Sequence, residues 1–306
     1  MIKEIEIFNE KVKIKNYLCS NNPDNIIEGE YKFNLYIKIT DYCNAKCPFC
    51  SNQSSIPKKE NIDLNKLEIV LKELYSKNLL SRISITGGEP LLYIDRLNTI
   101  LNKIFEVIPN AFVTINTNGI NFDKIHEIET LDKLEGIHIS RHHYNDDLNN
   151  KLFAVKTATK EEIKELYNKT KNKQLIRLNC LLIKDLIDNK EEVEKYLEMA
   201  SDIGVFRVGF VSLMPTNDYC KEKYINFNDI FKELNNNFFS TNHYYDSKIC
   251  ECCNGIFLSK TGNLVEYYAR MTKELNCDYM RQLVYTPSNE LSVGFNKKKI
   301  LIPDKK

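Results

Sequence analysis

The chain has 306 residues, with 43 lysines and arginines against 42 aspartates and glutamates, ten cysteines and no tryptophan. A hydrophobic content of 42% is enough for a sizeable core and excludes wholesale disorder, while a net charge of +1 argues against binding to nucleic acid or to an anionic membrane. No apolar run approaches the ~20 residues of a membrane span, and the first residues lack the apolar core of a signal peptide. We therefore expect a cytoplasmic protein whose reduced cysteines bind metal more often than they form disulfides.

Short β-rich runs alternate with amphipathic helical patterns from about residue 35 to residue 215. Leu67, Leu71 and Leu74, for example, follow the spacing of a helix with one buried face. Repeated alternation predicts an α/β fold with a parallel sheet of βαβ units, built as an incomplete barrel or as an open doubly wound sheet. The predicted strands are residues 36–40, 82–86, 112–117, 136–140, 175–183 and 205–213, and the predicted helices are residues 64–77, 94–107, 122–131, 160–171 and 191–203.

These strands carry polar residues at every second position, such as Ser84 and Thr86 or Arg177 and Asn179. The positions between them are aliphatic, and side chains alternate across a strand. A sheet cannot bury so many polar groups without partners. We expect a curved sheet whose aliphatic face packs on helices and whose polar inner face lines a wet or ligand-filled cavity.

The sequence changes in character after residue 215. A helix is predicted over Asn228–Asn236, and two hairpins are predicted over Gly255–Tyr268 and Leu283–Phe295. We expect this part to form a small cysteine-rich β-hairpin domain. The predicted organisation is an N-terminal extension (residues 1–34), a main domain (residues 35–215) and a C-terminal domain (residues 216–306).

Three cysteines stand close together after the first predicted strand of the main domain, in the pattern C-x-x-x-C-x-x-C: Cys43, Cys47 and Cys50. Three soft thiolates suit a 4Fe–4S cluster with one open iron, or a zinc ion completed by a distant fourth ligand. The spacing resembles that of the radical S-adenosylmethionine (radical SAM) superfamily. In that family the three cysteines hold three irons, and the amino and carboxylate groups of S-adenosylmethionine chelate the fourth.

Further motifs support the resemblance over roughly residues 33–215. Gly87-Gly88-Glu89-Pro90 ends the second predicted strand of the main domain, and Thr117-Asn118-Gly119 ends the third. The resemblance implies that the two glycines let the backbone approach the cofactor and that Glu89 accepts from its ammonium group. The other positions that it assigns to cofactor binding are Phe49 and the last strand, with Val211, beside the adenine, and Ser140, Arg177 and Asn179 at the ribose and carboxylate.

Membership of this family would imply a partial (β/α)6 TIM-like barrel and reductive cleavage of S-adenosylmethionine to methionine and a 5'-deoxyadenosyl radical. The radical abstracts a hydrogen atom from the substrate. A flavodoxin or ferredoxin would supply the electron. A non-catalytic metal-binding scaffold is the alternative from a different functional class.

A second group of cysteines resembles the SPASM or Twitch tail of radical enzymes that oxidise their substrates. Such a tail holds an auxiliary 4Fe–4S cluster, but here two cysteines are adjacent and the hairpin returns through Tyr267-Tyr268 instead of a cysteine. The predicted ligands are Cys220, Cys250, Cys253 and Cys277, with Cys252 as the next candidate. The alternative is a set of reduced thiols in a structural tail, and Cys19 and Cys180 are expected to be structural.

An unusual run, Arg141-His142-His143, follows the fourth predicted strand. These residues are candidates to orient an anionic or hydroxylated substrate, and one histidine is a candidate to take a proton when a substrate radical is oxidised. In the alternative, Arg141 contacts the cofactor and the histidines satisfy carboxylates such as Asp146 and Asp147.

Two substrate classes remain open. One is a small polar molecule of sugar, aminocyclitol or nucleoside type, and the other is a short precursor peptide that is crosslinked or epimerised. About 35 residues precede the first predicted strand, too few for the N-terminal peptide-binding domain of ~80 residues that peptide maturases often carry. This favours the small molecule, or a peptide recruited by a separate protein.

Overall fold

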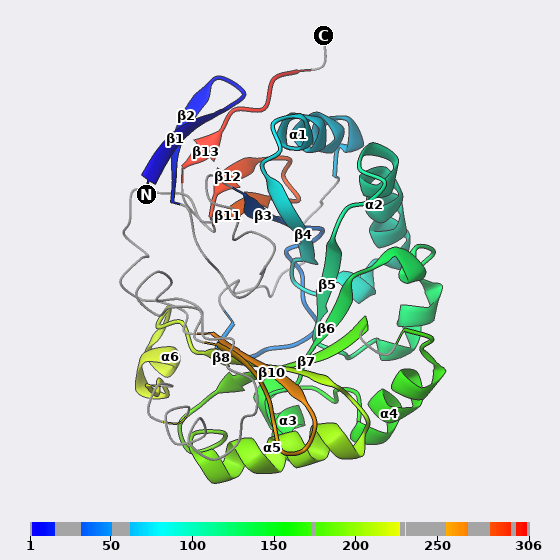
Figure 1. The fold of residues 1–306 in the computed structure, drawn as a ribbon, viewed down its shortest axis with the longest axis vertical. Helices are drawn as coiled ribbons and strands as arrows, with labels where there is room; N and C mark the ends of the chain where they lie inside the picture. Colours follow the sequence, from blue (N-terminus) through cyan, green and yellow to red (C-terminus); the bar gives the residue numbers. More distant parts are fainter. Residues whose placement is uncertain are drawn as a thin grey trace.

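The computed structural model describes residues 2–15, 32–50, 62–172, 175–226, 230, 255–268, 282–294 and 298–304. All six predicted strands of the main domain are present, each within a few residues of its predicted bounds: β3 (Phe33–Lys38), β4 (Leu80–Thr86), β5 (Val113–Thr117), β6 (Gly136–Ser140), β7 (Ile176–Leu182) and β8 (Arg207–Ser212). Neighbours in the chain pair in parallel from β3 to β8. The strands follow an arc with helices on its outer side, which confirms a partial TIM-like barrel (Figure 1).

The α-helices are α1 (Leu64–Ser76), α2 (Ile94–Val107), α3 (Asp146–Phe153), α4 (Lys160–Lys169), α5 (Lys190–Asp202) and α6 (Asp218–Glu222). Helix α1 buries Leu67, Leu71 and Leu74, as their spacing predicts. Thr159 and Glu162 form a capping box that starts α4. Helices α3 and α6 are not among the predicted elements.

The helix predicted over residues 122–131 is wrong. The segment forms two 3₁₀ turns, η3 (Phe122–Glu127) and η4 (Leu131–Lys133). Its apolar residues recur every third position, and residues three apart lie above one another in a 3₁₀-helix. Phe122, Ile125 and Ile128 are accordingly all buried. A further 3₁₀ turn, η2 (Pro90–Leu92), follows β4.

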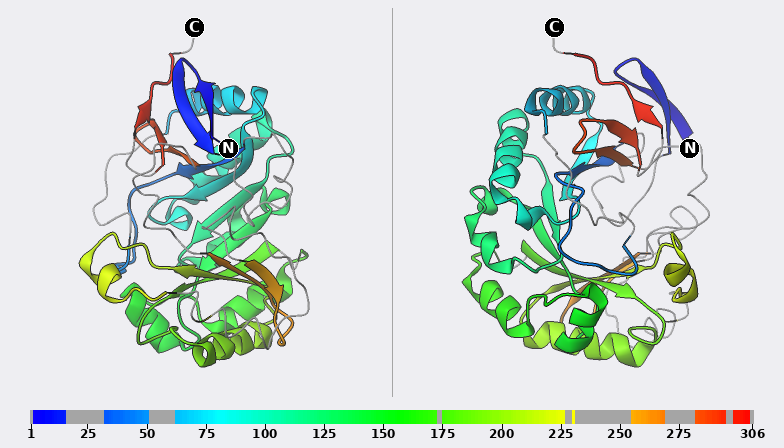
Figure 2. Two further views of the ribbon diagram at one scale, coloured as in Figure 1. Left: turned by 60° about the vertical axis from the view of Figure 1, so that its left-hand side comes forward. Right: turned by 180° about the vertical axis from the view of Figure 1, so that it is seen from behind.

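An N-terminal hairpin, β1 (Ile2–Ile7) with β2 (Glu10–Lys15), lies beside α1 (Figure 2). The Phe8 N–H donates to Glu73 Oε1 (2.6 Å), and Lys77 Nζ donates to the Glu6 carbonyl (3.0 Å). The hairpin was not predicted, and these two bonds attach it to the C-terminal end of α1.

Both predicted C-terminal hairpins are confirmed as antiparallel pairs: β9 (Gly255–Leu258) with β10 (Leu264–Tyr268), and β11 (Gln282–Tyr285) with β12 (Leu291–Val293). Strand β10 pairs in parallel with β8, β11 pairs in parallel with β3, and β13 (Lys299–Ile300) extends the sheet beyond β12. The result is one 11-stranded sheet in which tail strands cover both edges of the main-domain strands. Of the helix predicted over Asn228–Asn236, only Ile230 lies within the described residues.

The two faces of the sheet differ as predicted. Ile37, Ile85 and Ile115 are fully buried on the helix side. On the inner side, Ser84 and Thr114 share a hydrogen bond of 3.1 Å between neighbouring strands. Cys180 is fully buried on the helix side, as expected of a structural cysteine. Within the described residues, no helix has the length and apolar character that crossing a membrane requires.

Candidate functional site

The loop with the three clustered cysteines, residues 39–50, runs from the end of β3 toward α3 and α6 (Figure 2). Its Lys46 N–H donates to the Phe153 carbonyl of α3 (3.0 Å), and Asn217 Nδ2 beside α6 donates to its Pro48 carbonyl (2.9 Å). The three cysteines are half-buried. We call this segment the cysteine loop.

Gly87 and Gly88 bring the end of β4 against the backbone of the cysteine loop. A Cβ atom on Gly88 would lie 1.8 Å from the Tyr42 carbonyl oxygen, and one on Gly87 would lie 2.4 Å from that of Thr40. The backbones are also bonded, because the N–H of Gly88 donates to Thr40 (2.8 Å) and that of Glu89 donates to Tyr42 (2.9 Å). The contact that requires both glycines is therefore with the cysteine loop itself.

Glu89 joins the ends of β4 and β5. Its Oε1 accepts from the Leu91 N–H (3.0 Å) and from the Thr117 hydroxyl (2.7 Å), and its Oε2 accepts from the Asn118 N–H (2.7 Å). Pro90, which begins η2, is buried beside it. Burial raises the pKa of Glu89 to about 7 although these three donors lower it.

Asn118 connects β5 to the cysteine loop. Its Nδ2 lies 3.0 Å from Asn44 Oδ1 and 3.5 Å from Cys43 Sγ, and its Oδ1 accepts from the Ile120 N–H. Both sequence motifs, residues 87–90 and residues 117–119, thus support the loop that holds the cysteines.

His142 is on the inner side of the sheet, next to the cysteine loop. Its ring lies 5.0 Å, centroid to centroid, from the ring of Phe49 and stacks at 5.0 Å on Phe153. Its Nδ1 accepts from the Leu181 N–H (3.2 Å), so its ring proton is on Nε2. The acceptor nitrogen of the ring is therefore already used within the chain.

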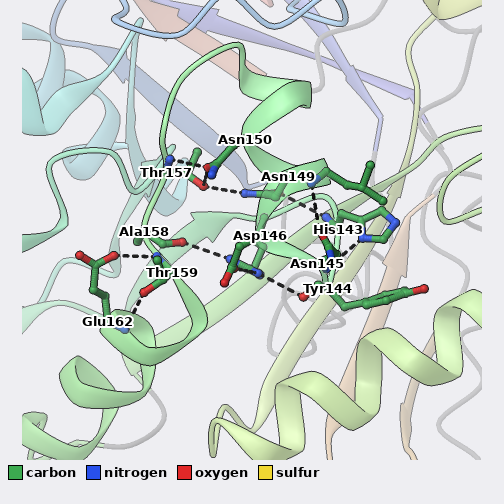
Figure 3. A network of polar contacts seen from close by, with 12 residues as sticks. His143, Tyr144, Asn145, Asp146, Asn149, Asn150, Thr157, Ala158, Thr159 and Glu162 are labelled. Carbon is green, nitrogen blue, oxygen red and sulfur yellow. Dashed lines mark hydrogen bonds and ion pairs between the residues drawn. The ribbon is translucent and has the colours of Figure 1, made fainter.

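Arg141 is on the opposite side of the sheet. Its side chain is 1% exposed, and its guanidinium donates to the carbonyls of Ala158 (3.1 Å) and Tyr144 (3.3 Å) and pairs with Asp146. Figure 3 shows these partners, Ala158, Tyr144 and Asp146, within a network of polar contacts. The structure does not bring Arg141 to the cysteine loop, because alternation along the strand directs it to the helix side.

His143 also faces away from the cysteine loop. Its ring lies 4.4 Å from that of Tyr144, whose hydroxyl donates to Glu192 on α5 (2.9 Å). Its Nδ1 accepts from the Asn145 N–H (3.0 Å), and burial lowers its pKa. Of the three predicted catalytic residues, only His142 is placed beside the cysteines.

The remaining predicted cofactor residues, Ser140, Arg177, Asn179 and Val211, lie on the inner face of β6, β7 and β8. Arg177 is committed elsewhere: its Nε donates to Asn179 (3.0 Å), and its Nη1 pairs with Glu266 of β10 (2.5 Å). It crosses β8 at Gly209, where a Cβ atom would lie 2.2 Å from Arg177 Nη2. Because Gly209 has no side chain, the Arg177 side chain can pass over β8 to Glu266 of the tail hairpin.

Cys220 is 1% exposed and packs among residues that touch the cysteine loop, with its Sγ 3.9 Å from the Phe49 carbonyl. The other predicted auxiliary ligands, Cys250, Cys252, Cys253 and Cys277, lie outside the described residues, as does Cys19.

The chemistry of the cysteine loop fits an iron–sulfur cluster. Burial, and then the neighbouring thiols of Cys50 and Cys43, raise the pKa of Cys47 to about 12, so a cationic ligand is needed to stabilise its thiolate. In the described part of the chain, no three His, Cys, Asp or Glu side chains meet where one metal ion would fit. Three thiols on one loop suit a cluster, in which each cysteine binds a different iron.

Sequence reasoning missed two supporting residues on α3. Phe153 stacks on His142, and Asn149 Oδ1 accepts from the backbone N–H of His142 (2.7 Å) and His143 (3.3 Å). The Nδ2 of Asn149 also donates to the Thr157 hydroxyl (2.8 Å), as Figure 3 shows. The signal for α3 was Asn145 before two aspartates, a pattern typical of a helix start.

Comparison with known proteins agrees with this site. The sequence profile described as "Radical SAM superfamily" matches residues 37–200. The GTP 3',8-cyclase of Clostridium botulinum (strain Okra) is 27% identical over 195 residues, which cover 60% of this chain and 57% of that enzyme. The GTP 3',8-cyclase of Aquifex aeolicus is 25% identical over 246 residues, covering 78% of this chain and 74% of that enzyme.

Solved structures share the fold. SuiB of Streptococcus suis bound to S-adenosylmethionine has a TM-score of 0.60 at 17% identity, covering 88% of this chain and 63% of that chain. The chain thus spans less than two thirds of both SuiB and the C. botulinum enzyme. Since the matched profile covers more than half of the 306 residues, the chain belongs to the radical SAM superfamily, whose enzymes use S-adenosylmethionine and a 4Fe–4S cluster.

Proposed function

We propose that the chain is an oxidoreductase-type radical SAM enzyme that removes a hydrogen atom from a small polar substrate of sugar, aminocyclitol or nucleoside type. An auxiliary 4Fe–4S cluster in residues 216–306, held by Cys220, Cys250, Cys253 and Cys277, would assist the oxidation. The observation that carries the substrate class is the inner face of the sheet, where polar side chains on neighbouring strands face the space inside the arc. The relatives named GTP 3',8-cyclase favour the nucleoside type within this class.

The chain's own residues would hold and shield the reacting groups. Cys43, Cys47 and Cys50 would bind the cluster, and Phe49 and Val211 would lie beside the adenine. When bound, the cluster and S-adenosylmethionine supply reductive cleavage to methionine and a 5'-deoxyadenosyl radical, with an electron from a flavodoxin or ferredoxin. His142 lies between the rings of Phe49 and Phe153, and these aromatic side chains would shield the site from water.

The test is anaerobic reconstitution followed by dithionite, S-adenosylmethionine and a panel of nucleosides and nucleotides. We expect about eight irons per chain and formation of 5'-deoxyadenosine. The variant Cys47→Ala should form none. Cys180→Ala, which removes a buried thiol on the helix side of the sheet, is the matched control and should keep both the iron and the product. Zinc in place of iron would refute the proposal.

A short precursor peptide is the second candidate. SuiB has been solved bound to its precursor peptide SuiA, and that structure covers 88% of this chain with a TM-score of 0.58 at 15% identity. Deuterium transfer separates the two candidates. A labelled nucleoside that passes deuterium to 5'-deoxyadenosine supports the small molecule, and label arriving only from a peptide supports the maturase.

A further inference from the structure

Three arginines gather on the inner face of the sheet, in the half that contains the strand starts. They are Arg82 on β4, Arg177 on β7 and Arg207 on β8. Each occupies a position on its strand whose side chain faces the inner side of the sheet. His138, on β6 between them, is buried. We call Arg82, Arg177 and Arg207 the arginine cluster.

A single described carboxylate contacts the arginine cluster. Glu266 Oε2 pairs with Arg177 Nη1 (2.5 Å), and its Oε1 pairs with Arg207 Nη2 (3.3 Å). Arg207 Nε is buried without a hydrogen-bond partner, and no hydrogen bond or ion pair joins the Arg82 side chain to another described residue. One negative charge thus serves three positive charges among the described residues.

His138 is on β6, which lies between β4 and β8 in the strand order, and all three arginines act on it electrostatically. Burial lowers its pKa first, and the charges of Arg177, Arg82 and Arg207 lower it further. His138 therefore stays neutral and adds no charge to the cluster. Among the described residues the cluster has an excess of two positive charges, and such an excess at a partly buried position is costly unless an anion neutralises it.

We propose that the arginine cluster binds the phosphate group of the small substrate, an inference that rests on the proposed function. Guanidinium groups match the geometry of phosphate oxygens with paired N–H donors, and a phosphate monoester carries a charge close to the excess. The site is also at a suitable depth. Leu181, whose N–H binds His142 beside the cysteine loop, lies four residues beyond Arg177 on β7, about 13 Å along the strand.

That separation fits a molecule of nucleotide size. Its phosphate would lie at Arg82 and Arg207, and its sugar would lie toward His142 and Phe49. Arg177 keeps Glu266 and Asn179 as partners and fixes the position of the cluster.

The experiment measures pyrophosphate binding to the reconstituted holoenzyme by anaerobic calorimetry at fixed ionic strength. Arg82→Gln and Arg207→Gln should each weaken binding by about tenfold or more, because each removes a charge-assisted hydrogen bond. Arg207→Lys should recover part of the loss. Lys164→Gln, which makes the same charge change on the exposed face of α4, should leave binding unchanged.

The proposal would be overturned if the wild type did not bind pyrophosphate. It would also be overturned if Arg82→Gln and Arg207→Gln both bound pyrophosphate as tightly as the wild type does. Equally tight binding of citrate would overturn it too, because a site for carboxylates would suit an acidic peptide. The same samples are assayed for 5'-deoxyadenosine with S-adenosylmethionine and dithionite alone. If the wild type forms none, the proposed function fails, whereas product without pyrophosphate binding refutes only the phosphate site.

Discussion

At the scale of single residues, the polar groups around the cysteines mostly hold backbone in place. Glu89 uses both carboxylate oxygens on donors from its own chain, and His142 uses Nδ1 on a strand N–H. Such buried groups are costly if left unpaired. Their first role in this structure is therefore positional, and each makes a testable contribution to stability.

The carboxyl of Glu89 should make stability depend on pH. Its pKa is raised from 4.5 to about 7 in the folded chain, so the folded chain binds this proton more tightly than the unfolded chain does. The stabilisation is complete below pH 4.5 and is lost as the pH rises through about 7, a change of roughly 3 kcal/mol. Urea unfolding of the cluster-free protein between pH 5 and about 8 measures the free energy of unfolding of the wild type. The same measurement on Glu89→Gln gives the comparison.

The difference in unfolding free energy between wild type and Glu89→Gln should shrink as the pH rises. Glu135→Gln, which changes an exposed carboxyl, should run parallel to the wild type. Parallel profiles for Glu89→Gln as well would mean that Glu89 is ionised throughout this range.

Two substitutions distinguish the contribution of the His142 acceptor nitrogen to stability from the contribution of its ring contacts. His142→Phe keeps the contacts with Phe49 and Phe153 but leaves the Leu181 N–H unpaired, at a cost of about 1–3 kcal/mol. His142→Asn offers an acceptor without the ring and should cost about 0.5–1.5 kcal/mol. Denaturant unfolding measures both. If the asparagine variant keeps its stability and 5'-deoxyadenosine formation but yields no substrate-derived product, His142 acts on the substrate and does more than accept from the Leu181 N–H.

At the scale of elements, the site is an assembly of strand ends. The ends of β4 and β5 contact the cysteine loop through Gly88, Glu89 and Asn118, while α3 and the residue before α6 hold its far side. Parallel strands bring these ends to one edge of the sheet, so motifs far apart in sequence meet there. The closest of these contacts is at Gly88.

Gly88→Ala should displace the cysteine loop. The added Cβ would lie 1.8 Å from the Tyr42 carbonyl, so 5'-deoxyadenosine formation should fall by about tenfold or more while the fold is kept. Gly262→Ala is the control, because no atom lies within 4 Å of its Cβ position and only its positive φ is strained. Equal activity of the two variants would contradict the role given to Gly88.

At the scale of the whole molecule, the tail and the main domain share one sheet. Strands β10 and β11 cover the two edges that β8 and β3 would otherwise expose, and both edges are thereby protected from pairing with other chains. The Arg177–Glu266 pair adds a buried link between β7 and β10 across Gly209.

Breaking this link on one side should destabilise the molecule. Glu266→Leu leaves Arg177 and Arg207 without their carboxylate and should cost about 3–5 kcal/mol, and the double variant with Arg177→Met should recover much of that loss. Denaturant unfolding of both singles and the double measures the coupling. Lys72→Met in the exposed pair with Glu68 should change stability by less than about 0.5 kcal/mol. A coupling equally small for the buried pair would rule out the link.

The sequence by itself determined the six-stranded alternation, the two faces of the sheet, the cysteine loop and the superfamily, because these depend on local periodicity and on motifs with fixed spacing. It did not distinguish the 3₁₀ turns at residues 122–133 from a helix, since the same apolar residues satisfy both. Only the tertiary structure decided that His142 contacts Phe49 of the cysteine loop and that Arg177 pairs with Glu266. The physical reason is that partners such as Arg177 and Glu266 lie 89 residues apart, and a contact at that distance follows from strand order, which no local pattern encodes.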